Sequence, residues 1–327
     1  MRPLLYVFVA VAFFVSVVPA GAHEVYVLSP DTIAHDLSTP SPNPFDSFAT
    51  NRFQFFFWGF LAFVLVTTVF FASITHRFEI FFEPYLTRLR PMAPVVARVT
   101  LGLCLLASAY NHALFGPELP IEQLQLFGLF AFWGLWLSGV LIVLGIFPRL
   151  AALVAVGIFA VGTLQWGSYM LNYANYLGEM AVVLLLGSAA ISTKRLEPYA
   201  FLILRIAFGI SVIFASVYGK FIHSNLALST VSQYHLTNFF PFDPLFIVLG
   251  ACIIEVIMGI FFIIGFEVRH TALFFLFWIF LSLLYFGESV WPHMVLVGVN
   301  IALFMYGYDR WTVEGRLFNR GKLQPFL

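Results

Sequence analysis

Four ionisable side chains of this sequence lie in or beside strongly apolar runs, where charges are costly. Glu255 lies near the middle of one run, and Lys220 directly follows the run before it. Glu288 lies in a short connection, and His293 begins the last run. A lysine and a carboxylate cost less inside a membrane when they are paired or share a wet cavity. We therefore expect Glu255 and Lys220 to face one functional site, with Glu288 and His293 at its exported mouth, where an imidazole can exchange protons.

Glu179 is a fifth candidate, about two turns inside the apolar run 173–191. Like Glu255, it has two interpretations. Either carboxyl group takes up and releases protons during a redox or transport step, or it stays protonated and bonded to a neighbouring backbone or tyrosine group. Lys220 has its own structural alternative, because a lysine side chain can extend its ammonium group to the membrane interface.

The histidines and cysteines are weaker candidates. We place six of the eight histidines on the exported side, and neutral imidazole is the commonest metal ligand, so haem binding is one interpretation. Their spacing matches neither a helical i,i+4 pair nor an HExxH motif, and we assign no metal ligands. The alternative is histidines at the level of the lipid head groups. Cys104 and Cys252 are interpreted as small buried hydrophobic residues.

The composition places these candidates in a membrane protein. Of the 327 residues, 61% are hydrophobic and only 10% are charged, with a net charge of zero. Soluble proteins have about 45–50% apolar and about 25% charged residues. So few charges cannot cover a water-soluble surface of this size, which disfavours a soluble enzyme, a nucleic-acid-binding protein and a disordered chain. The expected partner is the lipid bilayer, and no nucleic acid is expected.

Nine apolar runs follow a polar N-terminal segment, and a spanning helix takes about 20 residues. We therefore expect an all-α polytopic membrane protein with nine transmembrane helices. The runs are 53–75, 95–115, 123–147, 150–166, 173–191, 200–219, 243–265, 270–286 and 291–307.

The N-terminus is typical of a secretory signal peptide. Arg2 precedes an apolar run that ends in small residues, which predicts cleavage after Ala22 rather than retention as an uncleaved helix. Six parts are then expected along the chain. They are a signal peptide (1–22), an exported N-terminal segment (23–52), an extra transmembrane helix with an interfacial segment (53–94), a first four-helix unit (95–192), a second four-helix unit (200–308) and a cytoplasmic tail (309–327).

The distribution of Lys and Arg predicts the orientation. With the mature N-terminus exported, nine helices leave the C-terminus in the cytoplasm. Only Arg52 and Lys220 are then exported, and thirteen basic residues lie at cytoplasmic positions, as the positive-inside rule requires. The thirteen are Arg77, Arg88, Arg90, Arg98, Arg149, Lys194, Arg195, Arg205, Arg269, Arg310, Arg316, Arg320 and Lys322. The expected location is the bacterial cytoplasmic (inner) membrane.

The sequence also contains an internal repeat. Residues 131–190 align without a gap with 251–310, and every glycine of the second window meets a glycine of the first. The matched pairs are Gly139 and Gly259, Gly145 and Gly265, Gly167 and Gly287, Gly178 and Gly298, and Gly187 and Gly307. The preceding helices align as well, Arg98 with Arg205 and Gly102 with Gly209. We therefore expect two four-helix units of the same orientation, related by an axis along the membrane normal.

The second unit carries a recognisable pattern of basic, acidic and glycine residues in its first two helices. The matching residues are Arg205, Gly209, Lys220, Glu255, Gly259, Gly265 and Arg269. This pattern resembles the DoxX family of four-helix membrane proteins. The first unit departs from it, because Leu135 stands in place of Glu255 and Ala113 in place of Lys220. Any chemistry is therefore expected in the second unit.

The resemblance implies quinone-linked or thiol-linked redox work beside a partner oxidoreductase subunit, and the enzymatic role of this chain is left open. The cofactor is unidentified, quinone and haem being the two considered, and a homo-oligomer is compatible with the sequence. Two other functions remain: a transporter or permease for a metal ion or small solute, and a non-catalytic assembly subunit. No nucleotide-binding motif supports ATP-driven transport.

Overall fold

The computed structural model describes residues 27–49, 54–188, 195–287 and 291–317. Within these ranges all regular structure is helical, apart from one isolated bridge between Ala113 and Pro120. The helices are α3 (Pro30–Ser38), α4 (Gln54–Leu89), α5 (Ala93–Tyr110), α6 (Gly128–Leu144), α7 (Pro148–Trp166), α8 (Ala174–Leu186), α9 (Glu197–Ser216), α10 (Ser224–Gln233), α11 (Pro244–Ile264), α12 (Val268–Phe286), α13 (Met294–Tyr306) and α14 (Val313–Leu317). The expected signal peptide and Glu288 lie outside the described residues.

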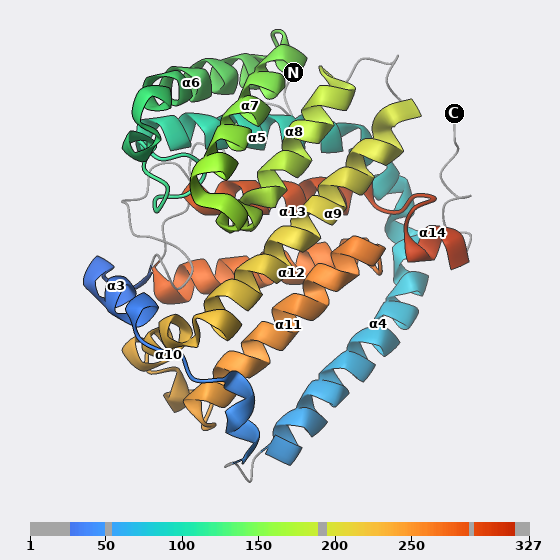
Figure 1. The fold of residues 1–327 in the computed structure, drawn as a ribbon. Coiled ribbons are helices and arrows are strands. Elements are labelled where there is room, and N and C mark those ends of the chain that lie inside the picture. Colours follow the sequence, from blue (N-terminus) through green and yellow to red (C-terminus); the bar gives the residue numbers. More distant parts are fainter. Residues whose placement is uncertain (1–26, 50–53, 189–194, 288–290, 318–327) are drawn as a thin grey trace.

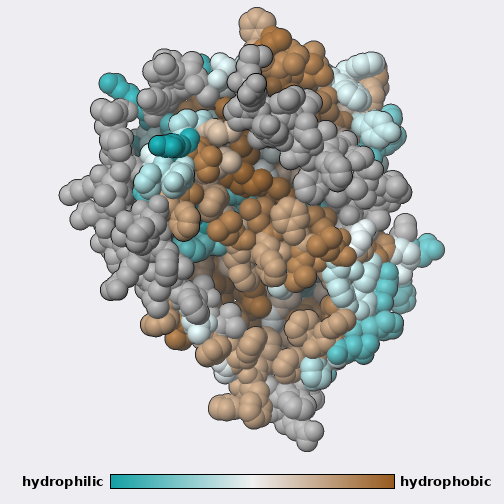
Figure 2. Space-filling view, turned by 180° about the vertical axis from the view of Figure 1, so that it is seen from behind, coloured by the Kyte–Doolittle hydropathy of each residue, from teal (hydrophilic) through white to brown (hydrophobic). Residues whose placement is uncertain are grey.

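The structure has the properties of an all-α membrane protein. Six of its helical segments are long and apolar enough to cross a bilayer. Figure 2 shows hydrophobic side chains gathered over the middle of one face, with hydrophilic ones near its margin. The helices α8 and α13 have only 13 residues each, about 20 Å at 1.5 Å per residue, which is shorter than a hydrocarbon core of about 30 Å. The expected count of nine spanning helices therefore stays a prediction.

Glycine contacts bring two pairs of helices close together. A Cβ atom at Gly102 of α5 would lie 2.9 Å from the carbonyl oxygen of Gly139 on α6. A Cβ atom at Gly209 of α9 would lie 2.5 Å from the carbonyl oxygen of Gly259 on α11. Small residues let helices approach closely in lipid, where packing contributes more than the hydrophobic effect.

An arginine lies beside the end of each of these helix pairs, Arg98 partly buried and Arg205 buried. Both α6 and α11 end at a glycine in the left-handed region, Gly145 with φ 71° and Gly265 with φ 73°. A side chain at either glycine would clash with an arginine, because its Cβ would lie 2.7 Å from Nη1 of Arg98 or 1.7 Å from Nη1 of Arg205. Each glycine thus leaves room for a guanidinium group at the end of its helix pair.

The helices form a first half (α5–α8) and a second half (α9 and α11–α13), which contact each other through their last helices. The helix α8 packs on α9, and α13 packs on α5, so each half lays its last helix against the first helix of the other. Gly178 of α8 lies against Leu204, and Gly298 of α13 lies against Thr100. Figure 1 shows α13 beside α5 and α8 beside α9, and one hydrophobic core extends through both halves.

Two segments outside the eight helices α5–α9 and α11–α13 add to the expected architecture. The helix α4 continues without a break to Leu89, whereas the sequence predicted a spanning run followed by a separate interfacial segment. Figure 1 shows α4 along the edge of the bundle beside α11, where the rings of Phe57 and Phe246 lie 4.3 Å apart. The residues after α13 fold back, with the Val313 amide donating to the Gly265 carbonyl at 3.0 Å. Burial raises the pKa of the Asp309 carboxyl in this folded-back segment.

Candidate functional site

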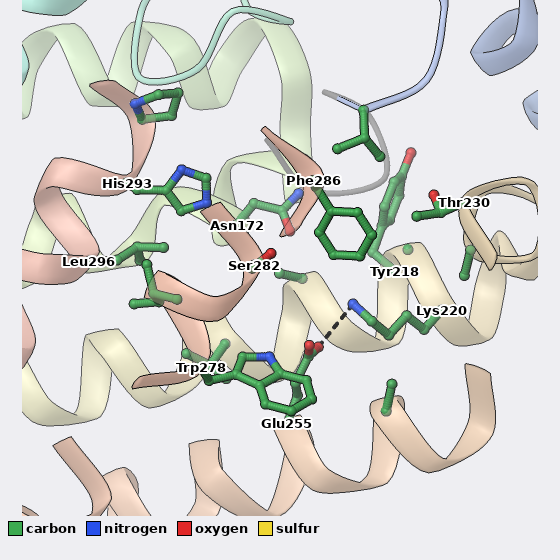
Figure 3. Close-up of a pocket in the computed structure, with 18 of the residues that line it drawn as sticks. Asn172, Tyr218, Lys220, Thr230, Glu255, Trp278, Ser282, Phe286, His293 and Leu296 are labelled. Atoms are coloured by element: carbon green, nitrogen blue, oxygen red, sulfur yellow. Dashed lines mark ion pairs between the residues drawn. The ribbon is translucent and has the colours of Figure 1, made fainter. Parts of the chain in front are cut away.

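The main pocket is a cavity of about 510 Å³ between the two halves. Its walls come from the ends of α9 and α12, the middle of α11 and the starts of α8 and α13, with α10 and the loop at Glu118 at its edge. Most of the lining is aliphatic or aromatic, and a few polar groups point into it (Figure 3). Such a lining is typical of a site for an apolar or amphipathic molecule whose orientation is fixed by polar contacts.

Lys220 and Glu255 form an ion pair in this pocket. The Lys220 Nζ atom lies 3.0 Å from Glu255 Oε2, and each side chain is 12% exposed (Figure 3). The pair joins the end of the α9 helix to the middle of α11. Two opposite charges so far from bulk water stabilise each other, because removing either one would leave the other buried without compensation. The structure therefore brings these two expected residues together.

The backbone around Lys220 is a π-helical turn, Val217–Ile222, that extends α9. Single π turns inside helices are rare and occur frequently at functional sites. The extra residue in this turn rotates the next residues of the chain relative to their positions in an unbroken α-helix. Both Tyr218 and Lys220 from this turn line the pocket.

Bulkier residues on α11 and α12 explain why the space opens beside these two helices and not beside α6 and α7. In the first half, α6 and α7 approach at Gly134, where a Cβ atom would lie 2.7 Å from Cδ1 of Ile158. The corresponding residues of the second half, at the offset found in the sequence, are the bulkier Ile254 and Trp278. A larger pair holds the two helices farther apart, since side chains cannot overlap, and Trp278 borders the opened space.

A second difference between the halves lies one helical turn farther along, at Gly162 of α7. A Cβ atom at Gly162 of α7 would lie 3.1 Å from both Leu114 and Met170, which close the first half at this level. The corresponding residue of α12 is Ser282, and it borders the pocket. The two apolar counterparts of the ion pair, Leu135 and Ala113, are buried in the first half.

His293 and Asn172 form a second polar region of the pocket. His293 directly precedes α13 and is only 3% exposed, so it is buried rather than at an open mouth. Figure 3 shows His293 and Asn172 pointing into the cavity from the side opposite Lys220, with Ser282 near its middle. Glu288, the fourth expected member, lies outside the described residues and cannot be placed in the pocket.

The first half contributes a polar group that the sequence did not single out. Glu118 lines the pocket, and its Oε1 atom accepts hydrogen bonds from the hydroxyl groups of Tyr169, at 3.0 Å, and Tyr173. Both tyrosines lie in the 3-10 helical segment Gly167–Tyr173 that precedes α8, and the tertiary structure brings them to the loop that carries Glu118.

Residues 27–49 and α10 cover one end of the pocket. Gln233 of α10 donates to the carbonyl of Val27 at 3.0 Å, and Asn225 donates to the carbonyl of Thr39 at 3.2 Å. Val27 itself lines the pocket. The segment expected to be a simple exported loop therefore forms part of the wall.

Glu179 lies apart from the residues that line the pocket. It is fully buried on α8, where Thr100 Oγ1 of α5 lies 2.8 Å from its Oε1 atom. Its neighbour one turn earlier, Tyr176, does line the pocket. Glu179 is therefore not a direct contact of a ligand bound in the cavity.

The described histidines and cysteines do not converge on a metal or haem site. His112 is exposed and stacks on Phe132 at 5.1 Å, whereas His223 lies 4.6 Å from the ring of Tyr218. Partial burial lowers the pKa of His223, which favours its neutral form. Within the described ranges, no group of three or more His, Cys, Asp or Glu side chains could hold a metal ion. Cys104 and Cys252 are both buried as free thiols.

Comparisons with protein-family models, curated proteins and solved structures found no match for this chain.

Proposed function

We propose that this protein is a DoxX-like integral membrane subunit whose pocket binds the head group of a quinone and presents it to a partner oxidoreductase. The single observation that carries the proposal is the Lys220–Glu255 ion pair inside an otherwise apolar cavity of about 510 Å³. A buried ion pair is weak evidence for stability alone, since apolar residues of similar volume serve a fold as well or better. Its presence in lipid-facing helices is better explained by function.

The groups around the cavity fit a quinone head. A quinone is a flat ring with carbonyl acceptors, and it supplies reversible two-electron, two-proton redox chemistry when bound. Hydrogen-bond donors are available from Lys220 in one region and from Asn172 in the other (Figure 3). The aromatic side chains of Phe275 and Trp278 supply apolar walls. Because the Lys220–Glu255 pair has no net charge, it suits a neutral ring better than a charged solute.

The proposal includes the nine-helix arrangement, in which one extra helix precedes two four-helix units of the same orientation. Its support is that the two halves make corresponding contacts at corresponding residues. The glycine contact and the glycine–arginine contact occur once in each half, and Arg149 lies against Gly187 as Arg269 lies against Gly307. Such agreement is expected of a duplicated unit.

The proposed orientation makes a direct prediction. A reporter fused after Leu327 should be active only as a cytoplasmic fusion, because thirteen basic residues lie at cytoplasmic positions in this topology. Single cysteines placed between Lys220 and Asp243, in a variant lacking Cys104 and Cys252, should react with a membrane-impermeant maleimide added outside the cell. Finding both positions on the same side of the membrane would contradict the nine-helix arrangement.

Quinone binding can be measured through Trp278. Short-chain ubiquinone-1 added to the purified protein should quench tryptophan fluorescence, because quinones are efficient quenchers and Trp278 borders the pocket. Most of this saturable quenching should disappear in Trp278→Phe. The matched control is Trp133→Phe, because Trp133 is 62% exposed on the outer surface of α6.

The same titration separates quinone binding from the other functions. Saturable quenching that Trp278→Phe removes and Trp133→Phe retains supports the proposal. Quenching that is unchanged in Trp278→Phe would show that ubiquinone-1 dissolves in the detergent or binds elsewhere. In that case, solute flux in liposomes would support a transporter, and co-purification with another chain without flux would support an assembly subunit.

A further inference from the structure

Glu179 is buried without a compensating charge. Its side chain is 0% exposed, and within the described part of the chain its Oε2 atom has no hydrogen-bond partner. Thr100, Cys104 and Tyr176 are the polar or titratable groups that face it, Thr100 and Cys104 from α5 and Tyr176 from its own helix. An ionised carboxylate in such surroundings carries a large desolvation penalty, which protonation removes.

The hydrogen bonds of Thr100 favour the protonated form. The Thr100 Oγ1 atom lies 2.8 Å from Glu179 Oε1 and also 2.8 Å from the carbonyl oxygen of Val96. A threonine hydroxyl has one hydrogen, so it cannot donate to both oxygens at once. If Glu179 carries a proton, it donates to Thr100, and Thr100 donates to Val96. Both contacts are then hydrogen bonds, whereas an ionised Glu179 leaves one of them unmade.

The fold itself does not require a polar pair at this place. By the alignment of the two units, the residues of the second half that correspond to Thr100 and Glu179 are Ala207 and Val299. Val299 is fully buried in α13, so an aliphatic residue packs there without difficulty. Threonine and glutamate thus occur together in one half and are both replaced by apolar residues in the other.

Tyr176 is a neighbour of Glu179 that also lines the pocket. It precedes Glu179 by three residues on α8, which places the two side chains on the same face of the helix. Tyr176 lines the pocket, and its hydroxyl donates to the carbonyl of Phe115 at 3.2 Å. A tyrosine hydroxyl both donates and accepts, so it can pass a proton between two neighbours.

We propose that Glu179 is a buried proton-binding site, protonated at neutral pH, that exchanges its proton with the pocket through the hydroxyl group of Tyr176. This site is distinct from the Lys220–Glu255 pair, which supplies a lysine donor and a carboxylate directly in the cavity. The inference does not depend on which molecule the pocket binds. It gives the pocket access to a proton held inside the bundle.

Infrared spectroscopy of the purified full chain tests protonation directly. A protonated carboxylic acid has a C=O stretching band well separated from the carboxylate bands. At neutral pH we expect such a band in the wild type, its loss in Glu179→Gln and its retention in the matched control Glu255→Gln. A wild-type spectrum that Glu179→Gln leaves unchanged would overturn the proposal. Thr100→Val gives a second test in which Glu179 itself is unchanged. Loss of the hydroxyl that accepts the Glu179 hydrogen bond should shift the band to higher frequency.

The route is tested by transfer into D₂O. The Glu179 band shifts as its proton is replaced by deuterium, and Tyr176→Phe should slow this shift roughly tenfold or more, which corresponds to at least about 1.4 kcal/mol in the exchange barrier. The control is Tyr169→Phe, which removes another pocket hydroxyl, one bonded to Glu118. Equal exchange rates in the wild type and Tyr176→Phe would overturn the assignment of Tyr176 as the route.

Discussion

Lys220→Met is expected to lower the free energy of unfolding by roughly 3–5 kcal/mol, because it leaves the Glu255 carboxylate buried without its partner. The two groups lie 3.0 Å apart and are each only 12% exposed, so solvent cannot replace the missing charge. Ubiquinone-1 affinity should fall as well, roughly tenfold or more, which corresponds to at least about 1.4 kcal/mol of binding free energy. Both quantities are measured on purified protein, the first by denaturation in mixed micelles and the second by fluorescence quenching.

The double variant Lys220→Met with Glu255→Leu separates stability from function. It replaces both charges by apolar side chains, and the corresponding Leu135 of the first half shows that leucine is tolerated at the second position. Stability should return close to the wild-type value, since neither charge is left unpaired, while ubiquinone-1 binding stays lost. Recovery of both properties would show that the pair has only a structural role.

Glu122→Gln provides the control for the ion pair. Glu122 lies 3.8 Å from His112, and its side chain is 68% exposed. Exposed ion pairs contribute little because water and salt screen them, so the change should stay within about 0.5 kcal/mol. A loss as large as that of Lys220→Met would indicate that removal of any carboxylate destabilises the protein in the chosen micelles.

Gly259→Ala is expected to destabilise the protein by about 1–3 kcal/mol through overpacking. The added Cβ would lie 2.8 Å from the carbonyl oxygen of Gly209 and 2.5 Å from Cγ1 of Ile213, so α9 and α11 must separate. Separation also moves the ends of Lys220 and Glu255 relative to each other, because they lie on these same two helices. Thermal unfolding and ubiquinone-1 titration measure the two effects.

Gly157→Ala is the matched control on α7. A Cβ atom at Gly157 meets nothing within 4 Å, and alanine is intrinsically the better helix former. Its midpoint of thermal unfolding should therefore stay unchanged or rise slightly. If Gly259→Ala behaves in the same way, the close approach of α9 and α11 is not needed for stability.

The sequence alone predicted much of the helical architecture. The apolar runs correspond to described helices, because the cost of burying backbone polar groups in lipid forces such runs to be helical. Their limits were less accurate, as α4 shows by continuing through residues where mixed charges had predicted an interfacial segment. The short helices α3 and α10 were not predicted, since they lie in polar segments without a long apolar period.

The sequence also predicted the pairing of Lys220 with Glu255, from the cost of isolated charges in a membrane. It could not predict that Glu118 would join this pocket, because Glu118 belongs to a loop of the first half, and the packing of α8 on α9 and of α13 on α5 brings the halves together. It placed His293 at an open mouth, whereas His293 is buried. The depth of a residue in the membrane follows from its position along its helix, but its exposure to solvent depends on the segments that cover the end of that helix.

The residue types of this chain determined that it is helical and suited to lipid, and its matched glycines predicted two related four-helix units. Only the tertiary structure decided that a cavity lies between the two halves, beside α11 and α12. Ile254 and Trp278 look like ordinary apolar residues in the sequence, and only the packing of α11 and α12 places Trp278 at the border of the cavity. A cavity forms where side chains from separate segments leave the space between them unfilled, so no single segment of sequence specifies it.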